Sequence, residues 1–233
     1  MRYVFTTKIE PVHTLDAEES NHVVRVLRAR AGEEFALVDG QGRRYVGKLI
    51  DADKRKCVFK TSLDIEVPPH PAPLTLVIAP TKSTDRFEWL LEKAMEYGVH
   101  RIQPVWTSRS ERKNAKMDRW QRILISALKQ SQQLWLTELE QPISWNDWLE
   151  NHKEQVSQGF IAHCLDLEKS HWFDEVPRDA PSWIAIGPEG DFSPEEIEQA
   201  LKLGVKPVSL GEQRLRTETA ALAAIQMHGL ALR

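Results

Sequence analysis

The sequence is poor in cysteine: among its 233 residues only Cys57 and Cys164 occur. They lie far apart, and neither has a neighbouring cysteine or histidine at the spacing of metal ligands. The pattern therefore indicates neither a disulfide framework nor a zinc site, and we expect no metal. Both thiols are expected to be reduced and to serve as packing residues.

Long apolar runs are also missing. Residues 1–5 (MRYVF) lead into no apolar stretch before a cleavage site, and no run approaches the length needed to span a bilayer. Hydrophobic residues make up 41% of the chain, which is enough for a sizeable core. We therefore expect a cytoplasmic globular protein without a membrane partner.

Phosphate-binding motifs are absent as well, since neither G-x-G-x-x-G nor G-x-x-x-x-G-K-[ST] occurs. The segment Ile186–Glu196 (IGPEGDFSPEE) runs from an apolar strand into a helix, where many proteins hold a phosphate, yet it carries Glu189 and Asp191. Carboxylates at a helix amino terminus disfavour a phosphate ligand. A neutral or cationic ligand held by backbone groups fits such a loop better.

Charge is unevenly spread over the chain, whose net charge is −3. Residues 1–60 hold 12 basic and 9 acidic residues, and the rest of the chain holds 19 and 25. Residues 101–122 nevertheless carry seven basic residues against Glu111 and Asp118. A local basic patch can bind phosphates even on an acidic protein, although a solvated surface explains the count equally well.

A proline-rich segment, Val67–Pro73 (VPPHPAP), predicts a domain boundary, because four prolines in seven residues exclude a helix and a central strand. We expect domains at residues 1–70 and 71–233. Upstream, the segments 34–38, 45–50 and 56–61 predict strands of a small β-barrel or curled sheet. Residues 17–30 predict one helix.

The predicted helix over residues 17–30 carries His22, Arg25 and Arg28 at spacings of three, which would place them on one face. Such a basic stripe could contact RNA, although solvated arginines are its commoner meaning.

Downstream of the boundary, strands and helices alternate, which predicts an α/β domain with a mostly parallel sheet. The predicted strands are residues 74–79, 101–106, 159–164, 182–186 and 206–210, and the predicted helices are residues 84–97, 117–134, 194–203 and 218–230. Ligands bind outside the carboxyl ends of such strands. Three loops that leave these ends are therefore expected to form one site: residues 80–82, 187–191 and 211–216.

The first of two informative loops combines turn and cap signals. Residues 187–190 (GPEG) fit a type I turn, and residues 193–196 (SPEE) fit a capping box with proline at the first helical position. A turn and a cap explain most of this segment. The remaining acidic character suits a cation such as the sulfonium of S-adenosylmethionine.

The second loop, residues 210–224 (LGEQRLRTETAALAA), leads from a strand into an alanine-rich helix. Gly211 permits a tight turn, Thr217 is a candidate helix cap, and Glu218 suits the first helical turn. Folding explains neither Arg214 nor Arg216. A salt bridge to a nearby glutamate is the structural explanation, and a role in the site is the functional one.

Together, GPEGDFSPEE and LGEQRLRTETAALAA resemble the signature of the ribosomal RNA small subunit methyltransferase E family, in the SPOUT superfamily of knotted methyltransferases. Residues 22–28 (HVVRVLR) are similar to the family's amino-terminal PUA-like RNA-binding domain, and residues 81–110 resemble the first βαβ unit of its catalytic domain. The resemblance covers nearly the whole chain.

This resemblance implies transfer of a methyl group from S-adenosylmethionine to N3 of a uridine near the decoding site of 16S ribosomal RNA, without a metal. It also implies a trefoil-knotted SPOUT domain and a homodimer. The cofactor residues that it indicates are Thr81, Ile186, Gly187, Pro188, Gly190, Leu210, Gly211, Leu215, Arg216 and Ala220. The RNA-binding candidates are His22, Arg25, Arg28, Arg109, Arg112 and Lys113.

Catalysis must remove the proton of uracil N3 and stabilise the anion that forms. Arg216 is the predicted stabiliser, and Glu218 is either a base or a helix-capping residue. Two other functions stay open: methylation of another RNA, such as a tRNA, and a non-catalytic role as an RNA-binding ribosome assembly factor.

The chain departs from the family pattern at three places. Asp191 stands where the family usually has a second glycine, Leu215 replaces an isoleucine, and Gln132-Gln133 replaces Gly-Arg. The missing arginine removes a phosphate or substrate contact, which Lys129 or the basic loop at residues 109–112 could replace.

Overall fold

The computed structural model describes residues 1–111 and 113–233, and they form two compact units. The first unit comprises Met1–Pro69 and Ile125–Leu136, and the second comprises His70–Leu124 and Thr137–Arg233. The predicted boundary after residue 70 assigns the segment 125–136 to the second domain, whereas in the structure this segment belongs to the first unit. The backbone explains the difference: Gly42 N–H donates to Leu134 O, and Leu136 N–H donates to Gly40 O, both at 2.9 Å.

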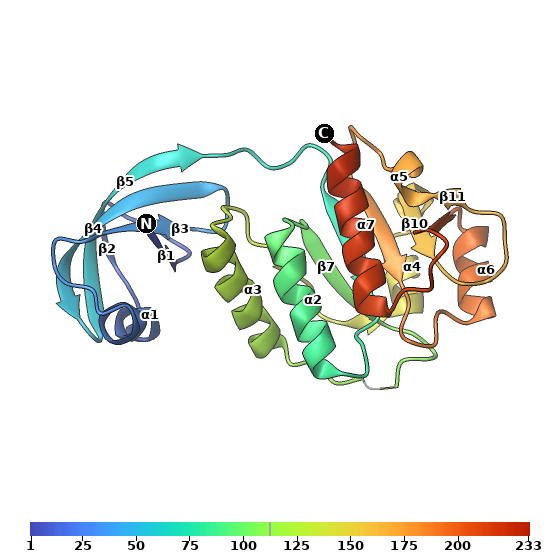
Figure 1. Ribbon diagram of the computed structural model, residues 1–233, viewed down its shortest axis with the longest axis horizontal. Coiled ribbons are helices and arrows are strands. Elements are labelled where there is room, and N and C mark those ends of the chain that lie inside the picture. The colour runs from blue at the N-terminus through green and yellow to red at the C-terminus, as the bar shows by residue number, and fades with distance from the viewer. Residues whose placement is uncertain (112) are drawn as a thin grey trace. The chain divides into compact units, whose positions relative to one another are not determined.

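The first unit is built on a five-stranded sheet in the order β1-β3-β4-β5-β2 (Figure 1). Its strands are β1 (Arg2–Phe5), β2 (Val12–Thr14), β3 (Glu34–Val38), β4 (Arg43–Asp53) and β5 (Lys56–Glu66). β3, β4 and β5 contain the three predicted strands, and β1 and β2 were not predicted. Cys57 is fully buried in the core of this unit, among residues that include Phe35, Leu49 and Phe59.

The helix predicted over residues 17–30 is much shorter in the structure. An α-helix, α1 (Ala17–Asn21), continues as one π-helical segment over His22–Val26. Arg28 then adopts a left-handed conformation with φ 52°, and this turn lets Ala29 enter the core. Arg28 therefore does not share a helix face with His22 and Arg25, and that part of the prediction was wrong.

The second unit contains a sheet in the order β11-β13-β10-β12-β6-β7-β8, with β9 beside β7. Every pair in this sheet is parallel, which confirms the predicted parallel α/β arrangement. The strands are β6 (Leu74–Ile78), β7 (Arg101–Trp106), β8 (Glu138–Leu139), β9 (Ile143–Ser144), β10 (Gly159–Ala162), β11 (Ser170–His171), β12 (Ser182–Ile186) and β13 (Lys206–Ser209).

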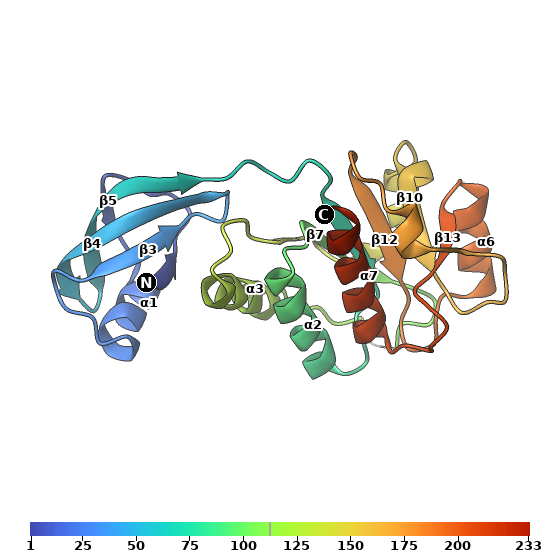
Figure 2. The ribbon, with the colours of Figure 1, turned by 45° about the horizontal axis from the view of Figure 1, so that its top comes forward.

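Helices lie on both faces of this sheet, and Figure 2 shows β10, β12 and β13 between α7 and α6. They are α2 (Thr84–Glu96), α4 (Trp145–Asn151), α5 (Trp172–Glu175), α6 (Pro194–Lys202) and α7 (Thr217–Ala231); α3 (Met117–Ser131) begins in the second unit and ends in the first. A short 3₁₀ helix spans Val156–Gln158. α4, α5 and the short strands β8, β9 and β11 were not predicted.

The two faces have separate packing partners. On one face, Trp145 and Trp148 of α4 and Ile197 of α6 pack with sheet residues that include Ile161 and Trp183. On the other face α7 packs against α2, and the indole N–H of Trp172 in α5 donates to Ala224 O at 2.9 Å. Because both faces are covered, a central strand can be buried along its whole length, as β12 is. Ligand sites in such a sheet lie in the loops at the carboxyl ends of the strands.

Within the described ranges, no helix is both long and apolar enough to cross a bilayer. The same residues include no group of three or more His, Cys, Asp or Glu side chains arranged to hold a metal ion.

Candidate active site at the carboxyl edge of the sheet

A cavity of about 710 Å³ opens at the carboxyl edge of the second unit's sheet. Its wall comes from the segments that leave β10, β12 and β13 and from the start of α7. The lining residues are Ala162, His163, Cys164, Lys169, Ile186, Gly187, Pro188, Glu189, Asp191, Val208, Ser209, Leu210, Gly211, Glu212, Gln213, Arg214, Leu215, Arg216, Thr217 and Ala220.

The loop after β12 is held on both sides by its two carboxylates. β12 lies between β6 and β10 in the sheet. Glu189 accepts a hydrogen bond from Lys82 N–H, beyond β6, at 2.9 Å, and Asp191 accepts one from Cys164 N–H, beyond β10, at 2.7 Å. The acidic residues thus connect neighbouring strand ends through backbone N–H groups. The turn itself lies one residue later than predicted, because Asp191 N–H closes it on Pro188 O at 2.9 Å.

The loop after β7 supports the same segment from a third direction. Arg109 donates from Nη1 to Gly190 O at 2.6 Å, and Ser108 N–H donates to Glu196 at 2.7 Å. Glu196 also completes the predicted capping box with Ser193 at the start of α6. A Cβ atom on Gly190 would contact the Arg109 side chain at 3.5 Å, and Gly190 does not line the cavity. Arg109, an RNA-binding candidate, therefore has a structural contact in this loop.

The loop after β13 supplies the basic part of the wall. Gly211 has φ +119°, a conformation that strains any other residue, so its predicted role in the turn is supported. Arg216 is the residue before the first turn of α7 and forms no side-chain cap, and Thr217 is the first helical residue and not the predicted cap. Arg214 and Arg216 are exposed, and within residues 1–111 and 113–233 neither forms an ion pair.

Glu218 lies in the first turn of α7, as predicted, but it does not line the cavity. Its carboxylate is 9% exposed and lies 3.7 Å from Nε of Arg86 at the start of α2. The helix places Thr217 and Ala220 at the cavity and turns Glu218 toward α2. This placement favours the helix-terminus role over that of a base.

The segment after β10 forms a wall that the sequence interpretation missed. The strand was expected to extend to Cys164, but it ends at Ala162. His163 and Cys164 follow it and line the cavity. Partial desolvation of the sulfur raises the pKa of the Cys164 thiol although the residue as a whole is exposed, and Asp191 acts in the same direction, so this thiol is a weak nucleophile. Cys164 is exposed, and our prediction of a packing residue was wrong for it.

Eight of the ten predicted cofactor residues line the cavity: Ile186, Gly187, Pro188, Leu210, Gly211, Leu215, Arg216 and Ala220. The remaining two do not: Gly190 contacts Arg109, and Thr81 is buried with its hydroxyl bonded to Ser83 O at 2.7 Å.

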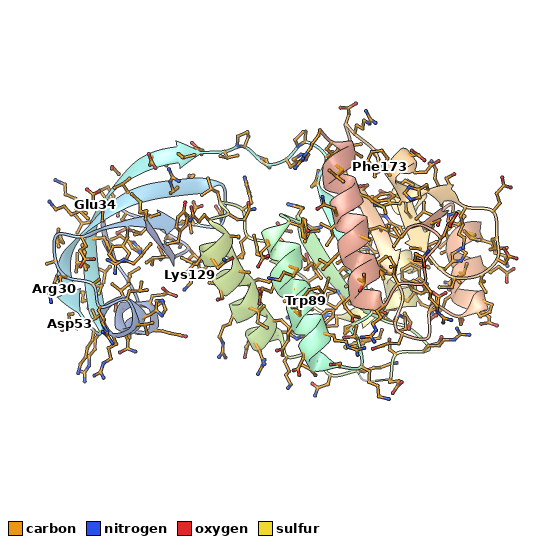
Figure 3. The ribbon with its side chains drawn as sticks, viewed as in Figure 1. Arg30, Glu34, Asp53, Trp89, Lys129 and Phe173 are labelled. Atoms are coloured by element: carbon orange, nitrogen blue, oxygen red, sulfur yellow. The ribbon has the colours of Figure 1, made fainter. Side chains whose placement is uncertain are left out.

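The RNA-binding candidates are distributed over both units. In the first unit His22 is half-buried, and Arg25 and Arg28 are exposed; in the second unit Lys113 is exposed. Arg112 lies outside the described residues. Lys129, suggested as a replacement for the family's missing arginine, instead pairs with Glu19 at 2.8 Å within the first unit, and Figure 3 labels its position on α3.

The comparisons with known proteins agree with this architecture. Residues 68–229 match a family model described as an RNA methyltransferase domain, and residues 15–62 match one described as an RNA methyltransferase PUA domain. Ribosomal RNA small subunit methyltransferase E of Synechocystis sp. is 30% identical to the chain over 221 residues, which cover 93% of the chain and 72% of that relative. The chain belongs to the ribosomal RNA small subunit methyltransferase E family.

Solved structures of similar proteins match this chain over nearly its whole length. A probable rRNA methyltransferase from Porphyromonas gingivalis is 36% identical, with a TM-score of 0.86 over 97% of this chain and 96% of that one. The family member from Neisseria gonorrhoeae, bound to S-adenosylmethionine, is 28% identical, with a TM-score of 0.82 over 97% and 95%. The predicted fold class, an α/β methyltransferase domain preceded by a small PUA-like domain, is confirmed, and the trefoil knot stays a prediction.

Proposed function

We propose that this methyltransferase transfers a methyl group from S-adenosylmethionine to N3 of a uridine in 16S ribosomal RNA near the decoding site. The observation that carries the proposal is the cavity, which is lined by both family signature loops and by eight of the ten predicted cofactor residues. The proposed substrate implies a cytoplasmic location.

The cavity fits S-adenosylmethionine in size and in chemistry. Its volume of about 710 Å³ lies within the range of small-molecule sites. The lining residues include apolar ones such as Ile186, Leu210 and Leu215 and both acidic and basic ones. A ligand that carries a sulfonium, an ammonium and a carboxylate requires such a mixed wall.

When bound, the cofactor supplies an electrophilic methyl group on its sulfonium. Arg216 adds a positive charge to the cavity wall that no ion pair among the described residues compensates, and its exposed side chain forms no helix cap. A cation there stabilises the anion that forms when uracil N3 loses its proton. Glu189 and Asp191 accept backbone N–H groups, and Glu218 lies outside the cavity wall, so we assign none of them as the base.

The function is tested by mass spectrometry of 16S rRNA nucleosides from cells with and without this protein. We expect N3-methyluridine in the first sample and its loss in the second. Purified protein should restore the modification to RNA from the deficient cells when S-adenosylmethionine is added. Loss of a methylated nucleoside from tRNA alone would contradict the assignment and support a tRNA substrate.

The first unit is proposed to bind RNA through His22, Arg25 and Arg28. Arg25 is exposed within the π-helical segment and Arg28 is exposed just after it; this rare conformation is frequent at functional sites. Arg28 is best replaced by asparagine, which tolerates its positive φ. The variant with Arg25→Ala and Arg28→Asn should bind an rRNA fragment more weakly, and its log Kd should depend less on log salt by about 0.7 per lost phosphate contact.

Filter binding of the RNA at several salt concentrations measures this slope, and Lys60→Ala, at an exposed position of β5, is the matched control. S-adenosylmethionine affinity should be unchanged. An unaltered salt slope in the double variant would show that these arginines are only solvated.

We further propose that the protein pairs as a homodimer through α7 and its neighbour α2. α7 is apolar around most of its circumference, yet Leu230 is 41% exposed, and Trp89 of α2 is 46% exposed (Figure 3). Large apolar side chains at the surface of two packed helices are typical of a protein interface. Sedimentation velocity should give the mass of two chains, and a monomer at micromolar concentration would contradict this proposal.

A further inference from the structure

His163 is a buried imidazole that no described residue satisfies. The residue lines the cavity at the first position beyond β10 and is only 8% exposed. Within residues 1–111 and 113–233, neither Nδ1 nor Nε2 has a hydrogen-bond partner. Buried polar groups in native proteins are almost always hydrogen-bonded, so an imidazole with two unbonded nitrogens at a cavity wall indicates that the occupant of the cavity bonds to it.

The backbone around this imidazole is fixed by two charged side chains. In the peptide unit between His163 and Cys164, the carbonyl oxygen accepts a hydrogen bond from Lys169 Nζ at 2.9 Å, and the N–H donates to Asp191 Oδ2 at 2.7 Å. Lys169 also donates to Leu165 O at 2.7 Å, which closes the loop after β10 on itself. Because the strand ladder ends at Ala162, these bonds take over the role of positioning His163.

Asp191 adopts a conformation that glycine would favour, with φ 66°. Its Oδ1 accepts the N–H of Phe192 at 2.8 Å while Oδ2 holds Cys164. A residue with a side chain is strained in this conformation, although aspartate tolerates it better than most. The two hydrogen bonds offset that strain, and they are what a glycine at this position would not supply.

The imidazole has one donor and one acceptor, neither of which is used by a described residue. Burial lowers the pKa of His163, the nearby Lys169 lowers it further, and Asp191 opposes them, so the ring is neutral near pH 7. A neutral imidazole complements neutral groups that also donate and accept, such as the edge of adenine or the hydroxyls of ribose. The charged side chains Glu189 and Arg214 elsewhere on the wall suit the charged amino-acid end of the cofactor.

We propose that His163 is a recognition residue that hydrogen-bonds the nucleoside part of S-adenosylmethionine, and that Lys169 and Asp191 are positioning residues that hold it there. This inference rests on the proposed cofactor. The segment after β10, which the sequence did not predict as part of the site, would then recognise the adenosine of the cofactor.

Calorimetric titration of His163→Phe with S-adenosylmethionine tests the contact, because phenylalanine keeps the ring and removes both polar atoms. We expect the Kd to rise by about tenfold, the size of effect typical for one hydrogen bond in a buried site. KM for the cofactor should rise in parallel, and kcat at saturating cofactor should stay within about twofold. The melting temperature without cofactor should hold or rise, because an unsatisfied polar group has been removed from the interior.

One control variant and one control ligand test whether His163 contacts the nucleoside part of the cofactor. His171→Phe makes the same substitution at an exposed residue that does not line the cavity, and it should leave the Kd unchanged. 5′-Methylthioadenosine lacks the amino-acid end, and its Kd should rise in His163→Phe by the same factor as that of S-adenosylmethionine. A loss confined to S-adenosylmethionine would place the contact at the amino-acid end and overturn the nucleoside assignment.

The positioning role of Lys169 is tested by Lys169→Met, which keeps the stem and removes the bond to His163 O. Alone it should raise the cofactor Kd about threefold, and in the His163→Phe background it should add nothing, because residues that act through one contact are not additive. Additive losses would show that Lys169 contacts the cofactor itself and overturn the positioning role.

An unchanged Kd in His163→Phe would overturn the inference, whereas a wild-type protein that binds no S-adenosylmethionine would instead refute the proposed function. If His163→Phe melts well below the wild type, His163→Asn serves in its place, since asparagine keeps a donor and an acceptor and should retain most of the affinity. Equal losses of cofactor affinity in both variants would assign His163 to packing and overturn the inference.

Discussion

Replacing Arg216 by alanine is expected to slow methyl transfer by about two to three orders of magnitude in single-turnover assays, the usual cost of removing one stabiliser of a developing anion. The melting temperature should stay near that of the wild type. This separation is expected because the guanidinium is exposed, makes no cap for α7, and forms no ion pair within the described parts of the chain. S-adenosylmethionine affinity should change little, because the charge of Arg216 is required only as the uracil anion forms.

Two further variants test whether the loss of rate is specific to the guanidinium of Arg216. Arg216→Lys should recover little activity, because lysine lacks the planar fork of two parallel donors. Arg178→Ala, at an exposed arginine that does not line the cavity, should keep the full rate. A normal rate in Arg216→Ala would move the stabilising role to Arg214, which lines the same cavity, and unfolding of that variant would make Arg216 a structural residue.

The second large effect concerns stability at acidic pH. His228 of α7 is buried, and Nε2 has no hydrogen-bond partner in the part of the chain that the structure describes. Burial lowers the pKa of this imidazole from 6.5 to about 4, and the nearby His70 contributes in the same direction. Between these values the unfolded chain binds a proton that the folded protein does not. The free energy of unfolding should therefore fall as the pH drops from about 6.5 toward 4, by about 3 kcal/mol in total and about 2 kcal/mol by pH 5.

Urea unfolding at pH 7.5 and pH 5 measures this loss. His228→Gln, which does not titrate, should be less sensitive to pH than the wild type by about 2 kcal/mol over this interval. Carboxylates and the other histidines are common to both proteins and cancel in the difference. Equal pH dependence in the two proteins would show that His228 is protonated in the folded state.

Several features of the active site were predictable from local sequence. The carboxyl ends of parallel strands meet at one edge, so an alternation of strands and helices was sufficient to bring the loops after β12 and β13 together. The capping box at Ser193 and the turn glycine at Gly211 were also predictable, because a helix start and a positive φ depend on neighbouring residues alone.

The errors occurred where a distant segment competes with local preference. Residues 17–30 have a helical pattern, but the helical segment ends at Val26, Arg28 is left-handed and Ala29 lies in the core of the first unit. The strand at residue 159 was expected to include His163 and Cys164, yet its partners β12 and β13 pair with it only as far as Ala162. Lys129 was treated as a free cation, and it pairs with Glu19, which lies 110 positions away.

The sequence alone therefore determined the class of the second unit, the family, and the loops that build the cavity, because periodicity, turn residues and capping residues are local properties. Only the tertiary structure decided what the charged residues in those loops do. Glu189 and Asp191 both accept hydrogen bonds from backbone N–H groups of neighbouring strand ends, Glu218 does not line the cavity, and His163 does. These roles depend on which strands are adjacent and on where each ladder stops, and both are set by packing between segments that lie far apart in the chain.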